Sequence, residues 1–166
     1  MVDAVVFSKK SDEWSSPKLL YDIMDRQFEF SLDPASTDEN ALCEMHYTQK
    51  DDGLKMPWWP ALSCYCNPPY SQASKWIAKA SAEATKGSTV VMLLAAHTDT
   101  KAFHDYICQK KGVYIWYIRG RLKFGGHSNS APFPSMVVVF AGKMLDAEDR
   151  LRRVQLDWDA RVKGKG

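Results

Sequence analysis

The sequence predicts an α/β protein in which helices cover both faces of a mostly parallel sheet. Four apolar runs, rich in branched and aromatic residues, have the length of buried strands; they occupy 61–66, 88–96, 113–118 and 134–142. Two stretches of helical character separate the first three runs. Because strands that alternate with helices build βαβ units, we expect a compact three-layer α/β/α sandwich.

The chain enters this fold through a helix expected over 14–28. A Ser-Ser-Pro sequence is typical of a helix start, and the apolar residues after it recur at helical spacing. An alternating apolar pattern from Phe28 to Leu32 then predicts a strand that Asp33-Pro34 ends. Residues 37–48 favour a short helix followed by a short strand.

The middle of the chain predicts a strand, a helix and a second strand. The strand 61–66 ends at Asn67, and the alanine-rich stretch 71–87 has a serine cap and closes at a glycine. The run 88–96 is apolar without interruption, which is typical of a central strand that is buried on both faces.

The last third predicts three further elements and one long loop. A helix is expected over 98–112, then a strand over 113–118. The polar stretch 119–133 is expected to be a loop. It precedes the strand 134–142 and a charged helix at about 145–162.

Composition indicates one domain that spans residues 1–166. Apolar residues make up 45% of the chain and charged residues 25%, as is ordinary for a globular protein. The net charge of +2 provides no strong overall field, so nucleic-acid binding would depend on local patches. The first ten residues do not resemble a signal peptide, and no apolar run is long enough to span a bilayer. We expect a protein of the reducing cytoplasm, with no membrane partner.

The four cysteines do not form a paired framework. Cys64 and Cys66 alternate on an expected buried strand, where cysteine behaves as a small apolar residue. A zinc site is the alternative, but a C-x-C sequence without a second pair is a poor zinc pattern. We expect buried thiols and no metal ion.

The segment Asn67-Pro68-Pro69-Tyr70 is the strongest chemical signal. Its two prolines fix two φ angles and favour an extended, stiff segment at the end of a strand. The Asn67 side-chain carbonyl and the Pro68 backbone carbonyl can accept hydrogen bonds from an amino group, and Tyr70 can stack on an aromatic base. Such acceptors stabilise the positive charge that grows on an amine during nucleophilic attack. The alternative is a rigid turn with no chemical role.

A strand, then "NPPY", then a helix resembles the catalytic motif of amino-group methyltransferases that use S-adenosylmethionine. The resemblance extends over residues 12–141. In order, the segments "WSSP", "LDPAS", "DDGL", "CNPPYSQASKW", "RGRLKF" and "PFPSMVVVF" resemble the small phage-type DNA N6-adenine methyltransferases, a Dam-like family. This resemblance implies a Rossmann-like methyltransferase fold and methyl transfer to N6 of adenine in double-stranded DNA. The catalytic residues that it implies are Asn67, Pro68, Pro69 and Tyr70.

The resemblance also implies positions that contact S-adenosylmethionine. They are Trp14, Ser16, Pro17, Asp33, Pro34, Ala35, Asp52 and Asn67. Ordinary structural roles compete with each of these: a helix cap at 16–17, a core anchor at Trp14, an Asp-Pro turn, and an Asp-Gly turn. No G-x-G-x-x-G sequence follows the first strand, which departs from methyltransferases at large and leaves open how the cofactor is held.

The implied DNA contacts lie in "RGRLKF". Phe124 is expected to hold the target base beside Tyr70 after the base is flipped out of the duplex. Three neighbouring residues, Arg119, Arg121 and Lys123, are candidates for phosphate binding, with a solvated turn as the alternative. The arginines of the last helix either touch DNA or form a charged exposed face. The chain is too short for a separate recognition domain, so loose specificity, a short site or a homodimer is expected.

Three alternatives to this function remain. The chain could methylate a protein glutamine or RNA, although protein-glutamine enzymes normally carry a glycine-rich cofactor loop. It could methylate N4 of cytosine, although that group usually has serine where this chain has Asn67. It could also be a catalytically silent DNA-binding relative.

Overall fold

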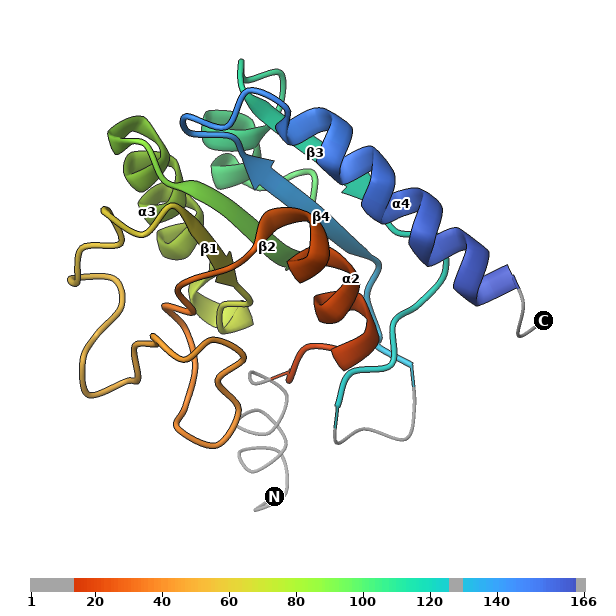
Figure 1. Cartoon of the computed structure of the whole chain (residues 1–166), viewed down its shortest axis with the longest axis horizontal. Coiled ribbons are helices and arrows are strands. Elements are labelled where there is room, and N and C mark those ends of the chain that lie inside the picture. Colours follow the sequence, from red (N-terminus) through yellow and green to blue (C-terminus); the bar gives the residue numbers. More distant parts are fainter. Residues whose placement is uncertain (1–13, 126–129, 164–166) are drawn as a thin grey trace.

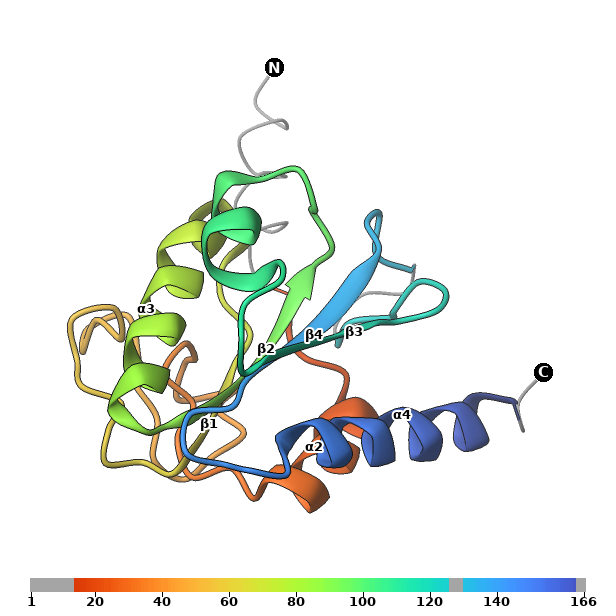
Figure 2. The same ribbon diagram turned by 90° about the horizontal axis from the view of Figure 1, so that it is seen from above.

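The computed structural model describes residues 14–125 and 130–163, and in it helices lie against both faces of a four-stranded sheet (Figures 1 and 2). The elements are α2 (Lys18–Phe28), β1 (Ser63–Cys66), the 3-10 helix η1 (Tyr70–Gln72), α3 (Ala73–Lys86), β2 (Thr89–Ala95), the π-helical turn η2 (Phe103–Ile107), β3 (Val113–Tyr117), β4 (Ser135–Phe140) and α4 (Ala147–Lys163).

The sheet has the strand order β1-β2-β4-β3, and its pairing is mixed. β1 pairs with β2 in parallel, whereas β4 pairs antiparallel with both β2 and β3. The prediction of a mostly parallel sheet was therefore wrong, since two of these three pairings are antiparallel. The described residues of the connection from β3 to β4, 118–125 and 130–134, contain no helix, and β4 lies between β2 and β3 and runs antiparallel to both.

The expected elements between α2 and β1 are reduced in the structure. In place of the strand predicted before Asp33, the structure has two isolated parallel bridges, Leu32 with Cys64 and Asp33 with His46. Residues 37–48 form turns and a bridge rather than the expected short helix. Polar side chains hold these turns; for example, the Thr37 backbone N–H donates to Asn40 Oδ1 at 2.7 Å. The bridges nevertheless extend the sheet beyond β1 with segments that run parallel to it.

Two apolar clusters hold the layers together, one on each face of the sheet. Val91 and Leu93 of β2 belong to the cluster that contains α2 and α4, whereas Val90 and Met92 belong to the cluster that contains α3 and η2. Successive side chains of a strand point to opposite faces, so a continuous apolar run fills both clusters. All seven residues of β2 are buried, which confirms the prediction for 88–96.

The thiols are free, as the sequence predicted. Cys43, Cys64 and Cys66 are buried, and Cys108 is half-buried. Burial raises the pKa of Cys64 to about 12, so this thiol stays protonated and inert at neutral pH. In residues 14–125 and 130–163, no three side chains of the metal-ligating types come together. Within the same ranges, no helix has the length and apolar character that crossing a membrane requires.

Two of the predicted site residues, Asp33 and Asn67, follow strand segments that end at the same edge of the sheet. Leu32 bridges Cys64 in parallel, so Asp33 and Asn67 follow neighbouring segments that run in the same direction. In open α/β sheets, ligands bind beyond the carboxyl ends of such strands. The functional site is therefore expected at this edge of the sheet.

Candidate active site

The NPPY segment, residues 67–70, leaves β1 in an extended conformation and leads into η1. Pro69 has φ −56° and ψ 133°, which is the extended geometry expected of this sequence. Pro68 is buried and Asn67 is half-buried. The segment is therefore pinned between the end of β1 and the start of a helix, with the Asn67 side chain near the surface.

The Asn67 carboxamide is held in one orientation by two acceptors. Its Nδ2 donates to the backbone carbonyl of Trp14 at 2.5 Å and to Ser16 Oγ at 3.0 Å. A backbone carbonyl only accepts, so the nitrogen and not the oxygen must face Trp14. Both amide hydrogens are used within the protein, and Oδ1 is the part of this side chain that remains to accept a hydrogen bond from a ligand.

The Trp14 segment connects the NPPY segment to the loop after β3. Ser15 and Gly125 form an antiparallel bridge, and the Gly125 N–H donates to the Ser15 carbonyl at 2.9 Å. The expected helix over 14–28 begins only at Lys18, because residues 14–16 lie in this extended pairing. Pro17 occupies the helix N-cap with φ −60°. Three predicted motifs, "WSSP", "NPPY" and "RGRLKF", therefore converge.

Four aromatic rings pack together at this junction. Trp14 contacts Phe124 and Phe133 with ring centroids 5.5 and 5.6 Å apart, and Tyr70 lies 4.6 Å from Phe133. Phe124 is only 1% exposed, so its ring contacts its aromatic neighbours rather than solvent. Its predicted contact with a target base stays a prediction. Phe133, which sequence analysis did not single out, flanks Tyr70 from the segment Pro-Phe-Pro before β4.

The Tyr70 hydroxyl lies buried in this cluster with no hydrogen-bond partner. Burial raises the pKa of Tyr70 well above its ordinary value, so the phenol is neutral at any physiological pH. A buried, unsatisfied hydroxyl costs free energy that a partner would recover. Tyr70 is thus better satisfied in an arrangement that gives its hydroxyl water or a ligand group.

Asp33, at the neighbouring strand end, is 4% exposed. Its Oδ1 accepts from the Ala35 N–H and its Oδ2 from the Leu42 N–H, both at 3.3 Å. Burial raises the pKa of Asp33 to about 6, although these hydrogen bonds and the charge on His46 work in the opposite direction. The carboxylate therefore organises the loop that carries Pro34 and Ala35.

This carboxyl group predicts a pH-dependent stability. The pKa of about 6 exceeds the ordinary 3.8, so the folded protein holds this proton more tightly than the unfolded chain. The stabilisation that this proton provides is fully present below pH 3.8 and is lost as the pH rises through about 6. A pKa difference of about two units corresponds to about 3 kcal/mol of folding free energy. The free energy of unfolding, measured with urea at pH 4 and at pH 6.5, should differ less between the two pH values in Asp33→Asn than in wild type. An identical difference in both proteins would contradict the shifted pKa.

The turn that contains Asp52 and Gly53 packs directly on the Asp33-Pro34 segment. A Cβ atom added at Gly53 would lie 2.0 Å from the Pro34 carbonyl oxygen and 2.9 Å from the Trp76 ring. Asp52 has a positive φ of 59°, and its half-exposed carboxylate accepts from the Leu54 N–H at 3.3 Å. The two segments expected to bind the cofactor are therefore in contact with each other.

Gly53→Ala should lower the free energy of unfolding by about 1–3 kcal/mol, because a methyl group cannot fit against the Pro34 carbonyl without a backbone shift. Gly112→Ala is the matched control: its Cβ would meet nothing within 4 Å, although its φ of +74° carries its own strain. Thermal unfolding compares the two. A Gly53→Ala protein as stable as wild type would show that the close approach is absent.

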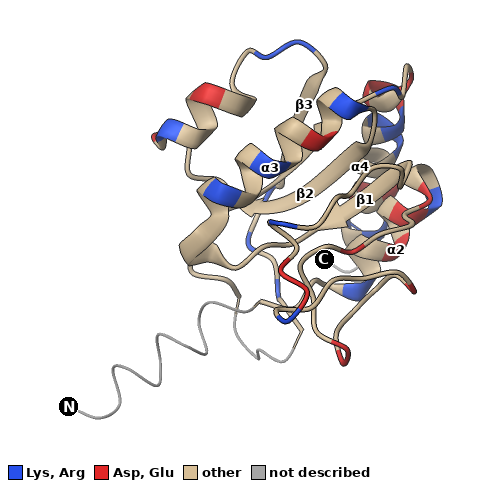
Figure 3. Ribbon diagram, turned by 90° about the vertical axis from the view of Figure 1, so that its left-hand side faces the viewer, with Lys and Arg blue, Asp and Glu red and all other residues tan. Residues whose placement is uncertain are grey.

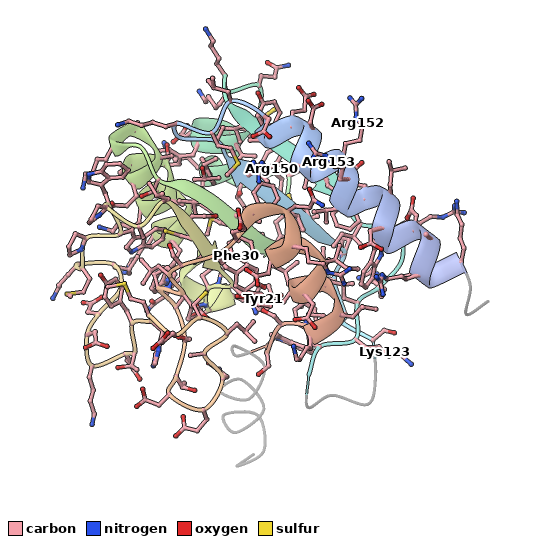
Figure 4. All side chains as sticks on the ribbon, in the orientation of Figure 1. Tyr21, Phe30, Lys123, Arg150, Arg152 and Arg153 are labelled. Carbon is pink, nitrogen blue, oxygen red and sulfur yellow. The ribbon has the colours of Figure 1, made fainter. Side chains whose placement is uncertain are left out.

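The basic residues of "RGRLKF" and of α4 differ in their surroundings. Arg119, Arg121 and Lys123 are exposed. In α4, by contrast, Arg150 donates to the Gln27 carbonyl at 2.5 Å and to Asp146 at 2.9 Å, which ties α4 to the end of α2. Figure 4 shows Lys123 well away from Arg150 and its neighbours, and Figure 3 shows basic and acidic positions mixed along α3. Arg152 and Arg153 of α4 are also exposed, so we prefer the loop because it leads to Phe124, which packs at the NPPY segment.

Two cavities among the described residues lie away from the NPPY segment. One, of about 380 Å³, lies between β3 and α4, and another, of about 250 Å³, lies around Gly112 and Gly142. Both are near the amino end of β2, the edge opposite Asn67. At the NPPY segment, the Trp14 backbone carbonyl contacts Asn67 Nδ2, and the Phe133 ring packs on Tyr70. Neither of these two cavities contains a residue of the predicted site.

The family described as DNA N-6-adenine-methyltransferase (Dam) matches residues 4–150 of the chain. The chain belongs to this family. The relatives that it resembles include a DNA N-6-adenine-methyltransferase of Escherichia phage T1, 31% identical over 106 residues, and one of Haemophilus phage HP1, 29% identical over 147 residues. These alignments cover 63% and 82% of the chain; they span 44% of the phage T1 protein and 83% of the phage HP1 protein.

Membership of this methyltransferase family confirms the resemblance that the spaced motifs indicated. The roles of the individual site residues stay predictions. The structure brings together Trp14, Ser16, Asn67, Tyr70 and Phe124, and separately brings Asp33, Pro34 and Ala35 against the turn that carries Asp52. Arg119, Arg121 and Lys123 lie on the loop that leads to Phe124.

Proposed function

We propose that this member of the Dam family transfers a methyl group from S-adenosylmethionine to N6 of adenine in double-stranded DNA. One observation carries most weight: the Asn67 carboxamide is clamped through Nδ2, so that Oδ1 is the atom left to meet a substrate. An adenine amino group offers two hydrogens and needs acceptors during attack. Oδ1 of Asn67 and the carbonyl of Pro68 would supply them, and no strong base would be required.

The residues at the carboxyl edge fit S-adenosylmethionine in their chemistry. The cofactor carries an ammonium group and ribose hydroxyls, which carboxylates bind, and the half-exposed Asp52 is able to accept from them. Asp33 is committed to backbone N–H groups, so it would act by shaping the Pro34-Ala35 loop. Trp14, Ser16 and Pro17 would border the site from the other side. When bound, the cofactor would supply a methyl group already activated by the sulfonium.

The target base would have to be flipped out of the duplex to reach Asn67, and we propose that Tyr70 stacks on it. Tyr70 and Phe133 are in ring contact, so a base that stacks on this side of the Tyr70 ring would displace Phe133. Movement would also release the buried Tyr70 hydroxyl, which has no partner in the closed arrangement. Phe124 would then contribute to the wall of the base pocket.

We further propose that residues 1–166 act as one methyltransferase unit of the host cytoplasm, with a homodimer as one way to enlarge the DNA contact. The direct test incubates the protein with labelled S-adenosylmethionine and, in parallel, duplex DNA, RNA or a mixture of proteins. Label should enter DNA. Label that enters only RNA or protein, or no transfer together with no detectable cofactor binding, would overturn the proposal.

The loop of Arg119, Arg121 and Lys123 should contribute to the salt dependence of DNA binding. Each phosphate contact contributes about 0.9 to the slope of log K against log salt. Replacing all three residues by glutamine should reduce that slope by about 2–3. The matched control replaces Lys110, Lys111 and Arg152, which are exposed near the opposite edge of the sheet. If the loop variant has the same slope of log K against log salt as the control variant, the loop does not contact DNA phosphates.

A further inference from the structure

Tyr65 is a fully buried tyrosine whose hydroxyl points to the proposed active site. The side chain lies in β1, two residues before Asn67, and is 1% exposed. Its hydroxyl oxygen is 2.5 Å from Ser16 Oγ, and Ser16 Oγ is the second acceptor of Asn67 Nδ2. A continuous hydrogen-bonded path therefore runs from the core of the protein to the carboxamide that is expected to meet the substrate.

The direction of the hydrogen bonds in this path follows from donor strength. A phenol is a stronger donor than an aliphatic hydroxyl, and among the described residues the buried Tyr65 hydroxyl has one hydrogen-bond partner, Ser16 Oγ. With Tyr65 donating, Ser16 Oγ receives two hydrogen bonds, one from Tyr65 and one from Asn67. Its own hydrogen is then directed away from both.

The aromatic neighbours keep Tyr65 in place. Its ring packs against Tyr21 at 5.0 Å and against Phe30 at 5.3 Å, on the face of the sheet that α2 covers. Figure 4 labels Tyr21 and Phe30 close to α2, and both pack in the apolar cluster that contains Tyr65. The ring position is thus set by the core, and the hydroxyl transmits that position to Ser16.

We propose that Tyr65 is a positioning residue, which through Ser16 holds the Asn67 carboxamide with Oδ1 directed at the target amino group. This inference rests on the proposed function for its catalytic consequence, but the orientation of Asn67 is a property of the chain alone. Ser16 belongs to this relay as well as to the border of the cofactor site. The Trp14 carbonyl fixes which amide atom faces inward, and the Tyr65–Ser16 pair limits how far the amide can swing.

Tyr65→Phe tests the relay because it removes the hydroxyl and keeps the ring. Turnover on duplex DNA should fall about fivefold to tenfold, which is the effect of losing one hydrogen bond, with little change in KM. Tyr21→Phe is the matched control: it removes another buried hydroxyl of the same cluster, one that bonds to the Leu42 carbonyl and Cys43 Sγ. That variant should lose stability and keep its turnover.

Two further readouts separate positioning from a general structural effect. Adding Tyr65→Phe to Ser16→Ala should cost little more than Ser16→Ala alone, because both act through one path. In ¹⁵N-labelled protein without DNA, the Asn67 carboxamide protons should exchange faster in Tyr65→Phe than in wild type or Tyr21→Phe. The inference would be overturned if the Asn67 carboxamide protons exchanged at the same rate in Tyr65→Phe and wild type. It would also be overturned if the loss of turnover in the double variant equalled the product of the losses in the two single variants. Since the exchange measurement needs no activity, it decides the inference even if wild type fails to methylate DNA.

Discussion

Asn67→Ala is expected to lower the rate of methyl transfer to DNA by about a hundredfold to a thousandfold, the usual cost of removing one preorganised polar group from a transition state. The reason is geometric. Trp14 and Ser16 bind Nδ2, which leaves Oδ1 for the substrate, and alanine removes both the acceptor and its support. Single-turnover labelling on duplex DNA measures the change.

The same variant should fold like wild type, because Asn67 is half-buried and lies at the end of β1. It should bind S-adenosylmethionine within a few-fold of wild type, because Asn67 is one of eight positions predicted to contact the cofactor and the other seven are unchanged. Thermal unfolding and calorimetric cofactor binding provide these controls. If Asn67→Ala methylates DNA as fast as wild type while both controls hold, then Asn67 does not polarise the amino group.

Glu83→Ala is expected to cost about 3–5 kcal/mol of stability, the range for breaking a buried ion pair by removing one partner. Glu83 is fully buried in α3. Its Oε1 accepts from Lys79 at 2.8 Å and Lys86 at 2.9 Å, and its Oε2 accepts from the backbone N–H groups of Trp58 at 3.2 Å and Trp59 at 3.1 Å.

The loss should reach the proposed cofactor site through a short chain of contacts. Trp58, which Glu83 holds, donates from Nε1 to the Gly53 carbonyl at 2.8 Å, and Gly53 packs on the Pro34 carbonyl. We therefore expect Glu83→Ala to weaken cofactor binding as well as folding. Urea unfolding against Glu44→Ala, an exposed loop carboxylate that should change stability by less than about 0.5 kcal/mol, gives the comparison. Equal stability of the two variants would contradict this account.

The charge on Glu83 also has a defined pH window. Burial alone would raise its pKa, but hydrogen bonds from Lys79, the Trp59 N–H and Lys86 outweigh that effect and hold the pKa at about 2. The folded pKa lies below the ordinary 4.5, so this stabilisation is present above pH 4.5 and is lost as the pH falls toward 2. The pKa of Asp33 is shifted in the opposite direction. Replacing Asp33 and replacing Glu83 should therefore change the pH dependence of the free energy of unfolding in opposite directions.

Local patterns predicted most of the fold because they depend on near neighbours. The unbroken apolar run of β2 and the alanine-rich α3 appear where the sequence placed them. The direction of β4 could not be predicted in the same way, since a pairing partner is chosen by long-range contacts. The one local signal was the absence of a helical pattern over 119–133, which favours an antiparallel return over a crossover.

The candidate site was predicted as a set of motifs, and not as a set of contacts. Asn67 and Tyr70 were identifiable from the stiffness of two prolines. The clamp on Asn67 joins residues that are 51 and 53 positions apart, and no spacing rule in the chain indicates it. The sequence around Glu83 is typical of an exposed carboxylate on a helix. Only the structure shows that Glu83 is buried and accepts hydrogen bonds from the backbone N–H groups of Trp58 and Trp59.

The central claim concerns one atom, N6 of adenine, and one measurement addresses it. Duplex DNA is methylated with labelled S-adenosylmethionine, digested to nucleosides and separated by chromatography with mass detection. We predict that the label elutes as N6-methyldeoxyadenosine, and that Asn67→Ala forms this product about a hundredfold to a thousandfold more slowly. A label that elutes as N4-methyldeoxycytidine, or an adenine product that the variant forms as fast as wild type, would contradict the account.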